Sequence, residues 1–104
     1  MDINFVDGTI EVFINKLEKQ TIAKVLRMID LLERFGHKLG MPHSKNIEHK
    51  LFELRIRGHQ EIRLIYTFHN NTAVILHGFV KKSKKMPKKE LATAQQKLSA
   101  LDTV

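Results

Sequence analysis

The spacing of apolar residues predicts helices in the first third of the chain. Residues 2–6 are partly apolar and end at the turn pair Asp7-Gly8, which predicts a strand. Thr9 offers a hydroxyl as the N-cap of a helix, a second helix begins near Thr21, and Gly36 is a natural C-terminal stop. Apolar residues recur at spacings of three and four, which predicts a helical hairpin. They are Ile10, Phe13, Ile14 and Leu17 in the first helix, and Ile22, Val25, Leu26, Ile29 and Leu32 in the second.

From Leu51 the period changes to two, which is typical of strands. Residues 51–57 place Phe52, Leu54 and Ile56 on one face and Glu53, Arg55 and Arg57 on the other. Residues 61–68 continue the alternation, and residues 73–80 are apolar enough for a central strand that is covered on both faces. Short turns at residues 58–60 and 70–71 predict an antiparallel meander. Residues 37–49 show no period and are predicted to be a loop.

A C-terminal helix completes the predicted fold. Pro87 suits a first helical turn, where its missing donor is not needed. An apolar stripe follows, formed by Leu91, Ala94, Leu98 and Leu101. The order β-α-α-β-β-β-α predicts an α+β fold, with the helices packed on one face of an antiparallel sheet. The 104 residues suffice for one hydrophobic core, so we expect a single domain over residues 1–104.

Composition narrows the class of protein. The chain has 42% hydrophobic and 28% charged residues, which is typical of a soluble globular protein. Its longest apolar run, residues 73–76, is far below the roughly 20 residues of a membrane-spanning helix. No secretory signal opens the sequence, so the cytoplasm is the expected location and no membrane partner is expected. The absence of cysteine excludes a disulfide scaffold, a thiolate zinc site and a cysteine nucleophile.

The net charge of the chain indicates which kinds of partner it binds. Lys and Arg number 18 against 11 Asp and Glu, a formal net charge of +7. An excess of this size favours polyanionic partners, either nucleic acid or an acidic protein. The alternative is a solvated basic surface that only keeps the protein soluble.

A lysine cluster between the last strand and the last helix is the strongest single feature. Two of its members fall in the first turn of the predicted helix, where cations oppose the helix dipole. Its position between two folded elements separates it from the disordered basic tail that is the usual alternative, and phosphate binding would explain the unfavourable placement. The cluster consists of Lys81, Lys82, Lys84, Lys85, Lys88 and Lys89.

Three arginines form a second group. If the first two meander strands pair through their short turn, Arg55, Arg57 and Arg63 share one face with Glu53 and Glu61. Cross-strand ion pairs on a solvated face are one interpretation. The other is a concave basic site, bordered by the arginines and the lysine cluster, in which guanidinium forks bind a phosphodiester. The second interpretation requires the two groups of cations to converge in space.

Histidines and the single tyrosine are weaker candidates. The six histidines lack the paired spacing of a hydrolytic zinc motif, so neither a metal nor another cofactor is predicted. His59, at the turn beside Arg57, is the histidine best placed to move a proton. Tyr66 alternates with apolar positions and is expected in the core with its hydroxyl at an edge, where a phenol near cations could also transfer a proton.

Three stretches together resemble a known family. They are LFELRIRG at residues 51–58, IRLIY at residues 62–66 and LHGFVKKSKKMPKKE at residues 76–90. With the helical segments before them, they are similar to the HigB branch of the RelE/ParE toxin superfamily. The resemblance implies a compact microbial-ribonuclease-type fold and a type II toxin that cleaves mRNA in the ribosomal A site. In such enzymes the ribose 2′-hydroxyl attacks the adjacent phosphate without a metal.

The resemblance also implies roles for individual residues. Arg63 and Lys82 would stabilise the phosphorane, and Arg55 and Lys84 would hold the RNA backbone. Some relatives have a lysine as candidate base where this chain has Glu53, so His59, Tyr66 and Glu53 all remain candidates for moving the proton. The residues predicted to bind RNA are Arg57, Lys81, Lys84, Lys85 and Lys88.

The expected protein partner is a HigA-like antitoxin with a helix-turn-helix domain, which restrains the toxin by covering its basic site or by holding it away from the ribosome. Two other functions stay open. A ParE-like toxin would inhibit DNA gyrase without cleaving RNA, and a module that only binds nucleic acid would keep the surface charge without turnover.

Overall fold

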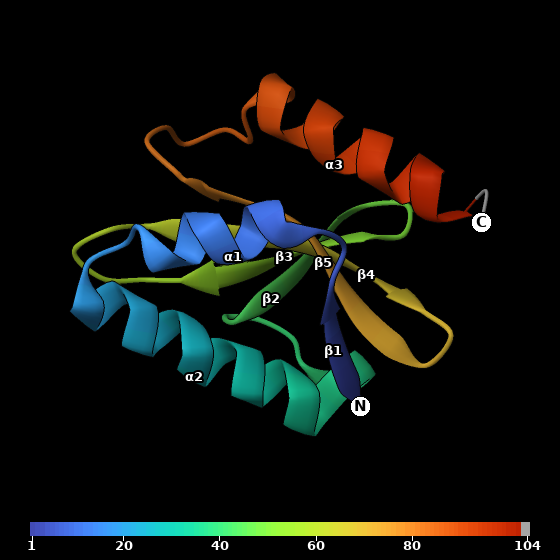
Figure 1. The fold of residues 1–104 in the computed structure, drawn as a ribbon, viewed down its shortest axis with the longest axis horizontal. Coiled ribbons are helices and arrows are strands. Elements are labelled where there is room, and N and C mark those ends of the chain that lie inside the picture. Colours follow the sequence, from blue (N-terminus) through green and yellow to red (C-terminus); the bar gives the residue numbers. More distant parts are fainter. Residues whose placement is uncertain (103–104) are drawn as a thin grey trace.

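The computed structural model describes residues 1–102, so the last two residues of the predicted domain lie outside the described part. A five-stranded sheet is the centre of the molecule (Figure 1). Its elements, in chain order, are β1 (Asp2–Phe5), α1 (Gly8–Asn15), α2 (Lys19–Phe35), a short 3-10 helix (Gly36–Lys38), β2 (Ser44–Glu48), β3 (Leu51–Ile56), β4 (Ile62–His69), β5 (Thr72–Val80) and α3 (Lys88–Asp102).

The predicted helical hairpin is present, and its ends differ slightly from the prediction. Asp7 and not Thr9 is the N-cap of α1, because the Asp7 carboxylate accepts a hydrogen bond from the Thr9 backbone N–H at 3.0 Å. The Thr9 hydroxyl also donates to this carboxylate, which lowers the pKa of Asp7. The second helix starts at Lys19, before Thr21, and Gly36 ends it with a positive φ of 52°.

The predicted meander is confirmed. Strands β3, β4 and β5 pair antiparallel in sequence order, and Asn70 and Asn71 turn the chain with positive φ angles of 50° and 60°. The edge strand β1 pairs parallel with β5, so the sheet is mainly but not wholly antiparallel. The sheet order is β1-β5-β4-β3-β2.

The prediction of a loop over residues 37–49 is wrong for Ser44–Glu48, which forms the edge strand β2. It pairs antiparallel with β3, from Ser44 opposite Leu54 to Glu48 opposite Leu51, with a bulge after Asn46. Only Ser44 is buried and only Ile47 packs on a core, so this strand carries no apolar alternation. The strand conformation of Ser44–Glu48 is therefore set by backbone pairing with β3 and not by a pattern of apolar side chains.

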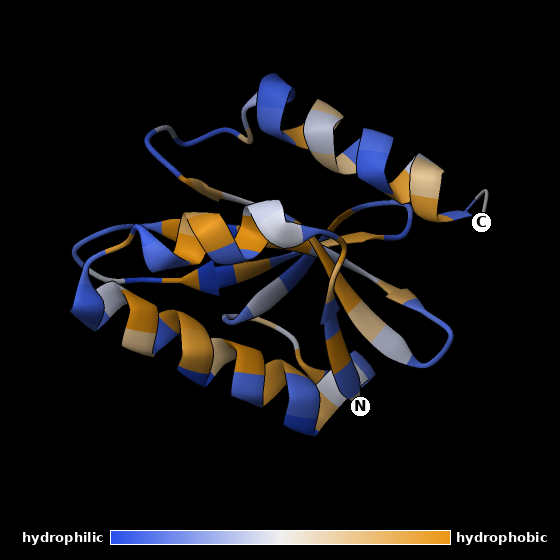
Figure 2. Ribbon diagram, in the orientation of Figure 1, coloured by the Kyte–Doolittle hydropathy of each residue, from blue (hydrophilic) through white to orange (hydrophobic). Residues whose placement is uncertain are grey.

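Helices cover both faces of the sheet, so the prediction that they all lie on one face is wrong. Figure 1 shows α3 on the opposite side of the sheet from α2, and Figure 2 shows apolar positions along the helices. Under α1 and α2 the core contains Ile10, Val25, Leu32, Leu54, Leu64 and Ile75. Under α3 a second core contains Leu51, Ile65, Val74, Leu76, Phe79 and Ala94. Both sheet faces carry buried aliphatic residues, and each needs its own cover.

The predicted α+β class is therefore confirmed, with one strand more than expected. No helix within residues 1–102 has both the length and the apolar character needed to cross a bilayer.

Candidate functional site

Two arginines lie side by side on the face of the sheet that α3 covers. Arg55 on β3 is directly opposite Arg63 on β4, and Arg63 is opposite Phe79 on β5. Phe79 belongs to the core under α3, and cross-strand neighbours share a face. The alternation predicted from the sequence is thus realised, because Leu54 and Ile56 face the other core.

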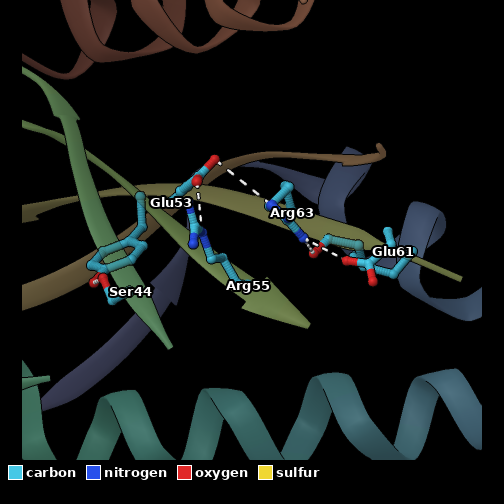
Figure 3. A network of polar contacts seen from close by, with 7 residues as sticks. Ser44, Glu53, Arg55, Glu61 and Arg63 are labelled. Carbon is cyan, nitrogen blue, oxygen red and sulfur yellow. Dashed lines mark hydrogen bonds and ion pairs between the residues drawn. The ribbon is translucent and has the colours of Figure 1, made fainter. Parts of the chain in front are cut away.

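A buried carboxylate joins the two arginines. Glu53 precedes Arg55 on the same face of β3 and is only 2% exposed. Its Oε1 accepts a hydrogen bond from Arg55 Nε at 2.9 Å, and its Oε2 lies 3.8 Å from Arg63 Nε. Figure 3 shows Glu53 between the two guanidinium groups. The carboxylate compensates two positive charges that would otherwise repel each other at close range.

The polar network continues from Arg63 to the start of β4. Arg63 Nη1 donates to Glu61 Oε2 at 3.1 Å and to the Ile62 carbonyl at 3.2 Å. The Arg63 side chain is 7% exposed, whereas that of Glu61 is 40% exposed. Polar contacts therefore connect Arg55, Glu53, Arg63 and Glu61 in that order, and Glu61 is the most exposed of the four (Figure 3).

Two atoms of this network lack hydrogen bonds. Glu53 Oε2 and Arg63 Nε are buried and have no hydrogen-bond partner among the described residues. They face each other as an ion pair at 3.8 Å, which is too long for a hydrogen bond. Unsatisfied buried polar atoms are uncommon in native proteins.

The lysine-bearing segment after β5 is held beside this network. The Lys81 backbone N–H donates to the Glu61 carbonyl at 2.7 Å, and the Ser83 hydroxyl donates to the Lys85 carbonyl at 3.0 Å. At the far end of the segment, His77 Nε2 on β5 lies 2.8 Å from Glu90 Oε1 in the first turn of α3. Contacts to the sheet on both sides thus fix where the segment begins and ends.

All three arginines and three lysines of the lysine cluster line one concave site of about 570 Å³, which we call the basic pocket. Glu61 and Ser83 complete its lining. The convergence expected from the sequence is therefore present, while the roles of the individual residues stay predictions. The cations of the basic pocket are Arg55, Arg57, Arg63, Lys81, Lys82 and Lys84.

Other predicted residues lie elsewhere. Lys85, on the segment after β5, and Lys88, the first residue of α3, are exposed but are outside the lining of the basic pocket. His59 is exposed at the β3–β4 turn, with Nδ1 3.4 Å from Glu18 Oε1. It too is outside this lining.

Tyr66 lies on the opposite face of the sheet. It is 1% exposed, belongs to the core under α1 and α2, and packs beside Phe52 and Phe68. Its hydroxyl forms a hydrogen bond with Ser44 Oγ. Burial raises the pKa of this phenol, and the Ser44 hydrogen bond acts in the opposite direction. The expectation of a core tyrosine is met, and its hydroxyl faces β2 and not the basic pocket.

Sequence reasoning did not single out Glu61 or Ser83 as site residues. The sequence placed Glu61 only among the charged residues on the face of the three arginines. Ser83 lies between lysines, and no sequence pattern distinguishes it as a site residue. The one available signal for Glu61 was its predicted position on the same face as Arg63. Within residues 1–102, no three His, Cys, Asp or Glu side chains lie together as a metal site would need.

Comparison with known proteins identifies the family of this chain and supports its fold. A family model described as phage-derived protein Gp49-like (DUF891) matches residues 12–99. The chain belongs to this family. No curated protein sequence matches it.

Two solved structures share the fold, and both are YoeB–YefM toxin-antitoxin complexes from Staphylococcus aureus. One is 20% identical with a TM-score of 0.54, over 72% of this chain and 90% of the matched chain. The other is 19% identical with a TM-score of 0.56, over 80% and 97%. At these identities the likeness concerns the fold, and the HigB branch stays a prediction.

Proposed function

We propose that this protein is the toxin of a type II toxin-antitoxin system and acts as an endoribonuclease on messenger RNA. The observation that carries the proposal is the basic pocket, in which six cations from β3 and its C-terminal end, from β4 and from the segment after β5 line one site. The fold shared with structures of a toxin-antitoxin complex supports the toxin role. Membership of the HigB branch, ribosome dependence and residence in the cytoplasm are parts of the same proposal.

The proposed chemistry is attack of a ribose 2′-hydroxyl on the adjacent phosphate. Charge builds up on the nonbridging oxygens in the transition state, and fixed cations stabilise it without reorganising. Arg63 is best suited to this task, because its burial and its bonds to Glu61 and Ile62 hold the guanidinium in place. Lys82, exposed on the segment after β5, also lines the pocket and would add a second positive charge at the phosphate.

The remaining cations would bind flanking phosphates. Arg55 is fixed by Glu53, so it offers a guanidinium of defined orientation, whereas Lys81 and Lys84 are flexible point charges. Arg57, at the end of β3, would extend the same contact along the RNA. Lys85 and Lys88 would contact RNA only beyond the pocket.

The proposed protein partner is an antitoxin encoded beside the toxin, of the HigA-like helix-turn-helix type. An acidic antitoxin segment over the basic pocket would neutralise its charge and exclude RNA. The proposed substrate is mRNA exposed in the ribosomal A site.

A double variant tests the proposal. Arg63→Ala with Lys82→Ala should abolish growth arrest on induction, whereas Arg34→Ala with Lys38→Ala is the matched control. The control removes the same charge from exposed positions at the C-terminal end of α2. Mapping of mRNA 5′ ends after induction should show breaks within translated codons for the wild type and the control only. Intact mRNA with a DNA-damage response would overturn the proposal and favour gyrase inhibition.

A further inference from the structure

The basic pocket contains a single negatively charged side chain. Arginine and lysine side chains carry hydrogen-bond donors and no acceptor, so six of the lining residues cannot take up a proton. The Ser83 hydroxyl is a weak base. Glu61 is the only carboxylate in the lining, and a carboxylate is a common general base in enzymes.

One oxygen of the Glu61 carboxylate has no hydrogen-bond donor among the described residues and can accept a proton. Oε2 accepts the hydrogen bond from Arg63 Nη1 at 3.1 Å, while no residue among 1–102 donates a hydrogen bond to Oε1. The backbone of Glu61 is fixed by its carbonyl, which accepts from Lys81 N–H at 2.7 Å. With a side chain that is 40% exposed, Glu61 combines a fixed position with access to a bound ligand.

The other groups considered for the proton are placed less well. Glu53 is 3% exposed at its side chain, and both of its oxygens face arginines. His59 is 81% exposed at its side chain, beside Glu18 and outside the pocket lining. Tyr66 is buried on the other face of the sheet. None of the three offers an accessible acceptor inside the pocket.

We propose that Glu61 is the general base of the cleavage reaction, which rests on the proposed ribonuclease function. Glu61 Oε1 takes the proton from the 2′-hydroxyl as the 2′-oxygen forms its bond to phosphorus. The bond from phosphorus to the 5′-oxygen then breaks, and the leaving oxygen takes both electrons of that bond and a proton from the Lys82 ammonium. The products are a 2′,3′-cyclic phosphate and a 5′-hydroxyl. Glu61 later loses its proton to water, and Lys82 regains one from water.

The pairing of Glu61 with Arg63 supports this assignment. A guanidinium is planar and presents several donors in a rigid fork, so it can bind a carboxylate and a phosphate at the same time. Arg63 would thus hold the base and the scissile phosphate next to each other. Such fixed proximity is what converts a weak base into an effective catalyst.

The test separates proton transfer from binding. Glu61→Gln keeps the shape of the side chain and removes its basicity, and Glu61→Asp keeps the carboxylate. The matched control is Glu18→Gln, which removes an exposed carboxylate beside His59. Each variant is assayed for single-turnover cleavage of mRNA on translating ribosomes across a range of pH. Its affinity is measured with an RNA that carries a 2′-deoxy group at the cleaved position.

For Glu61→Gln we expect cleavage to slow by about 100- to 10,000-fold and to lose its rise with pH. Binding of the 2′-deoxy RNA should be unchanged or tighter, because a negative charge has left a basic pocket. Glu61→Asp should retain part of the rate, and Glu18→Gln all of it. Wild-type rate and pH profile in Glu61→Gln would overturn the assignment while the ribonuclease proposal stands. Absence of cleavage by the wild type would overturn both.

Discussion

Arg55 and Arg63 lie directly opposite each other in the antiparallel ladder of β3 and β4. Like charges in this position destabilise a sheet, and here both side chains are largely buried. Glu53 bonds to Arg55 and pairs with Arg63, so one carboxylate compensates two guanidinium groups. Glu61 pairs with Arg63 as well, so the positive charge that a phosphate could neutralise comes from the other cations of the basic pocket. The site thus combines rigid positions with an incomplete charge balance.

Glu53→Gln should lower the free energy of unfolding by about 3–5 kcal/mol, because it removes the counter-ion of a buried pair and leaves two adjacent arginines. Inorganic phosphate should restore more stability to this variant than to the wild type, since it can take the place of the lost charge. Urea denaturation with and without phosphate measures both effects. Glu33→Gln, on the exposed side of α2, is the control. A loss in Glu53→Gln no larger than in the control would contradict this account.

The sheet shows what the sequence could predict about the fold. Residues 51–80 are recognisable as strands because each strand there has neighbours on both sides and is largely buried, β4 at six consecutive positions. Ser44–Glu48 does not alternate, because an edge strand with one packed side chain is specified by its partner. The face of the sheet that α3 covers could not be predicted from the sequence either. An apolar stripe indicates that a helix is buried but not which face of the sheet it covers.

Some residues of the basic pocket could be predicted from the sequence, and others could not. Period-two alternation placed Arg55 and Arg63 on one face, and both line the basic pocket. The lysines after β5 reach the pocket because Lys81 bonds to the Glu61 backbone, a contact between segments that no local pattern encodes. His59 lies outside the lining of the basic pocket, exposed at the turn beside Glu18, a contact that its place next to Arg57 in the sequence does not indicate. Glu61 belongs to the site through its contact with Arg63 Nη1, which no local pattern encodes.

Lys84→Ala should weaken RNA binding at every sequence and reduce its salt dependence. Removing one phosphate contact lowers the slope of log affinity against log salt by about 0.7 for single-stranded RNA. Titration of a 2′-deoxy-substituted RNA at several salt concentrations gives this slope. Lys38→Ala, an exposed lysine beyond the C-terminal end of α2, should leave it unchanged. Equal slopes for wild type and Lys84→Ala would remove Lys84 from the RNA contact.

Tyr66 should ionise above its ordinary pKa of 10.0, because burial disfavours the phenolate. A raised pKa in the folded state means that its contribution to stability is complete below pH 10.0 and is lost as pH rises through the folded pKa. The chain has one tyrosine and no tryptophan, so ultraviolet absorbance of the phenolate reports this residue alone.

A Ser44→Ala variant provides the comparison for this titration. The Ser44 hydrogen bond lowers the pKa of Tyr66, so its loss should move the midpoint of phenolate formation to higher pH. Circular dichroism across the same pH range shows whether ionisation accompanies unfolding. A wild-type midpoint at or below pH 10.0 would mean that the phenol is not buried as described.

Gly78 on β5 permits the close approach of α1 to the sheet. A Cβ atom at this position would lie 2.7 Å from the Phe13 side chain and 2.9 Å from that of Leu64. Both neighbours belong to the packed core or its margin, so relief requires α1 to shift. Gly78→Ala should therefore lower the free energy of unfolding by about 1–3 kcal/mol.

The matched control for this variant is Gly40→Ala, where a Cβ meets nothing within 4 Å. It should leave thermal stability close to that of the wild type. Phe13 packs on the core under α1 and α2, whereas Arg63 faces α3, so the Gly78 variant should keep its activity per folded molecule. Thermal unfolding and single-turnover cleavage below the midpoint separate the two quantities. If Gly78→Ala is as stable as Gly40→Ala, α1 is packed less tightly on β5 than these distances require.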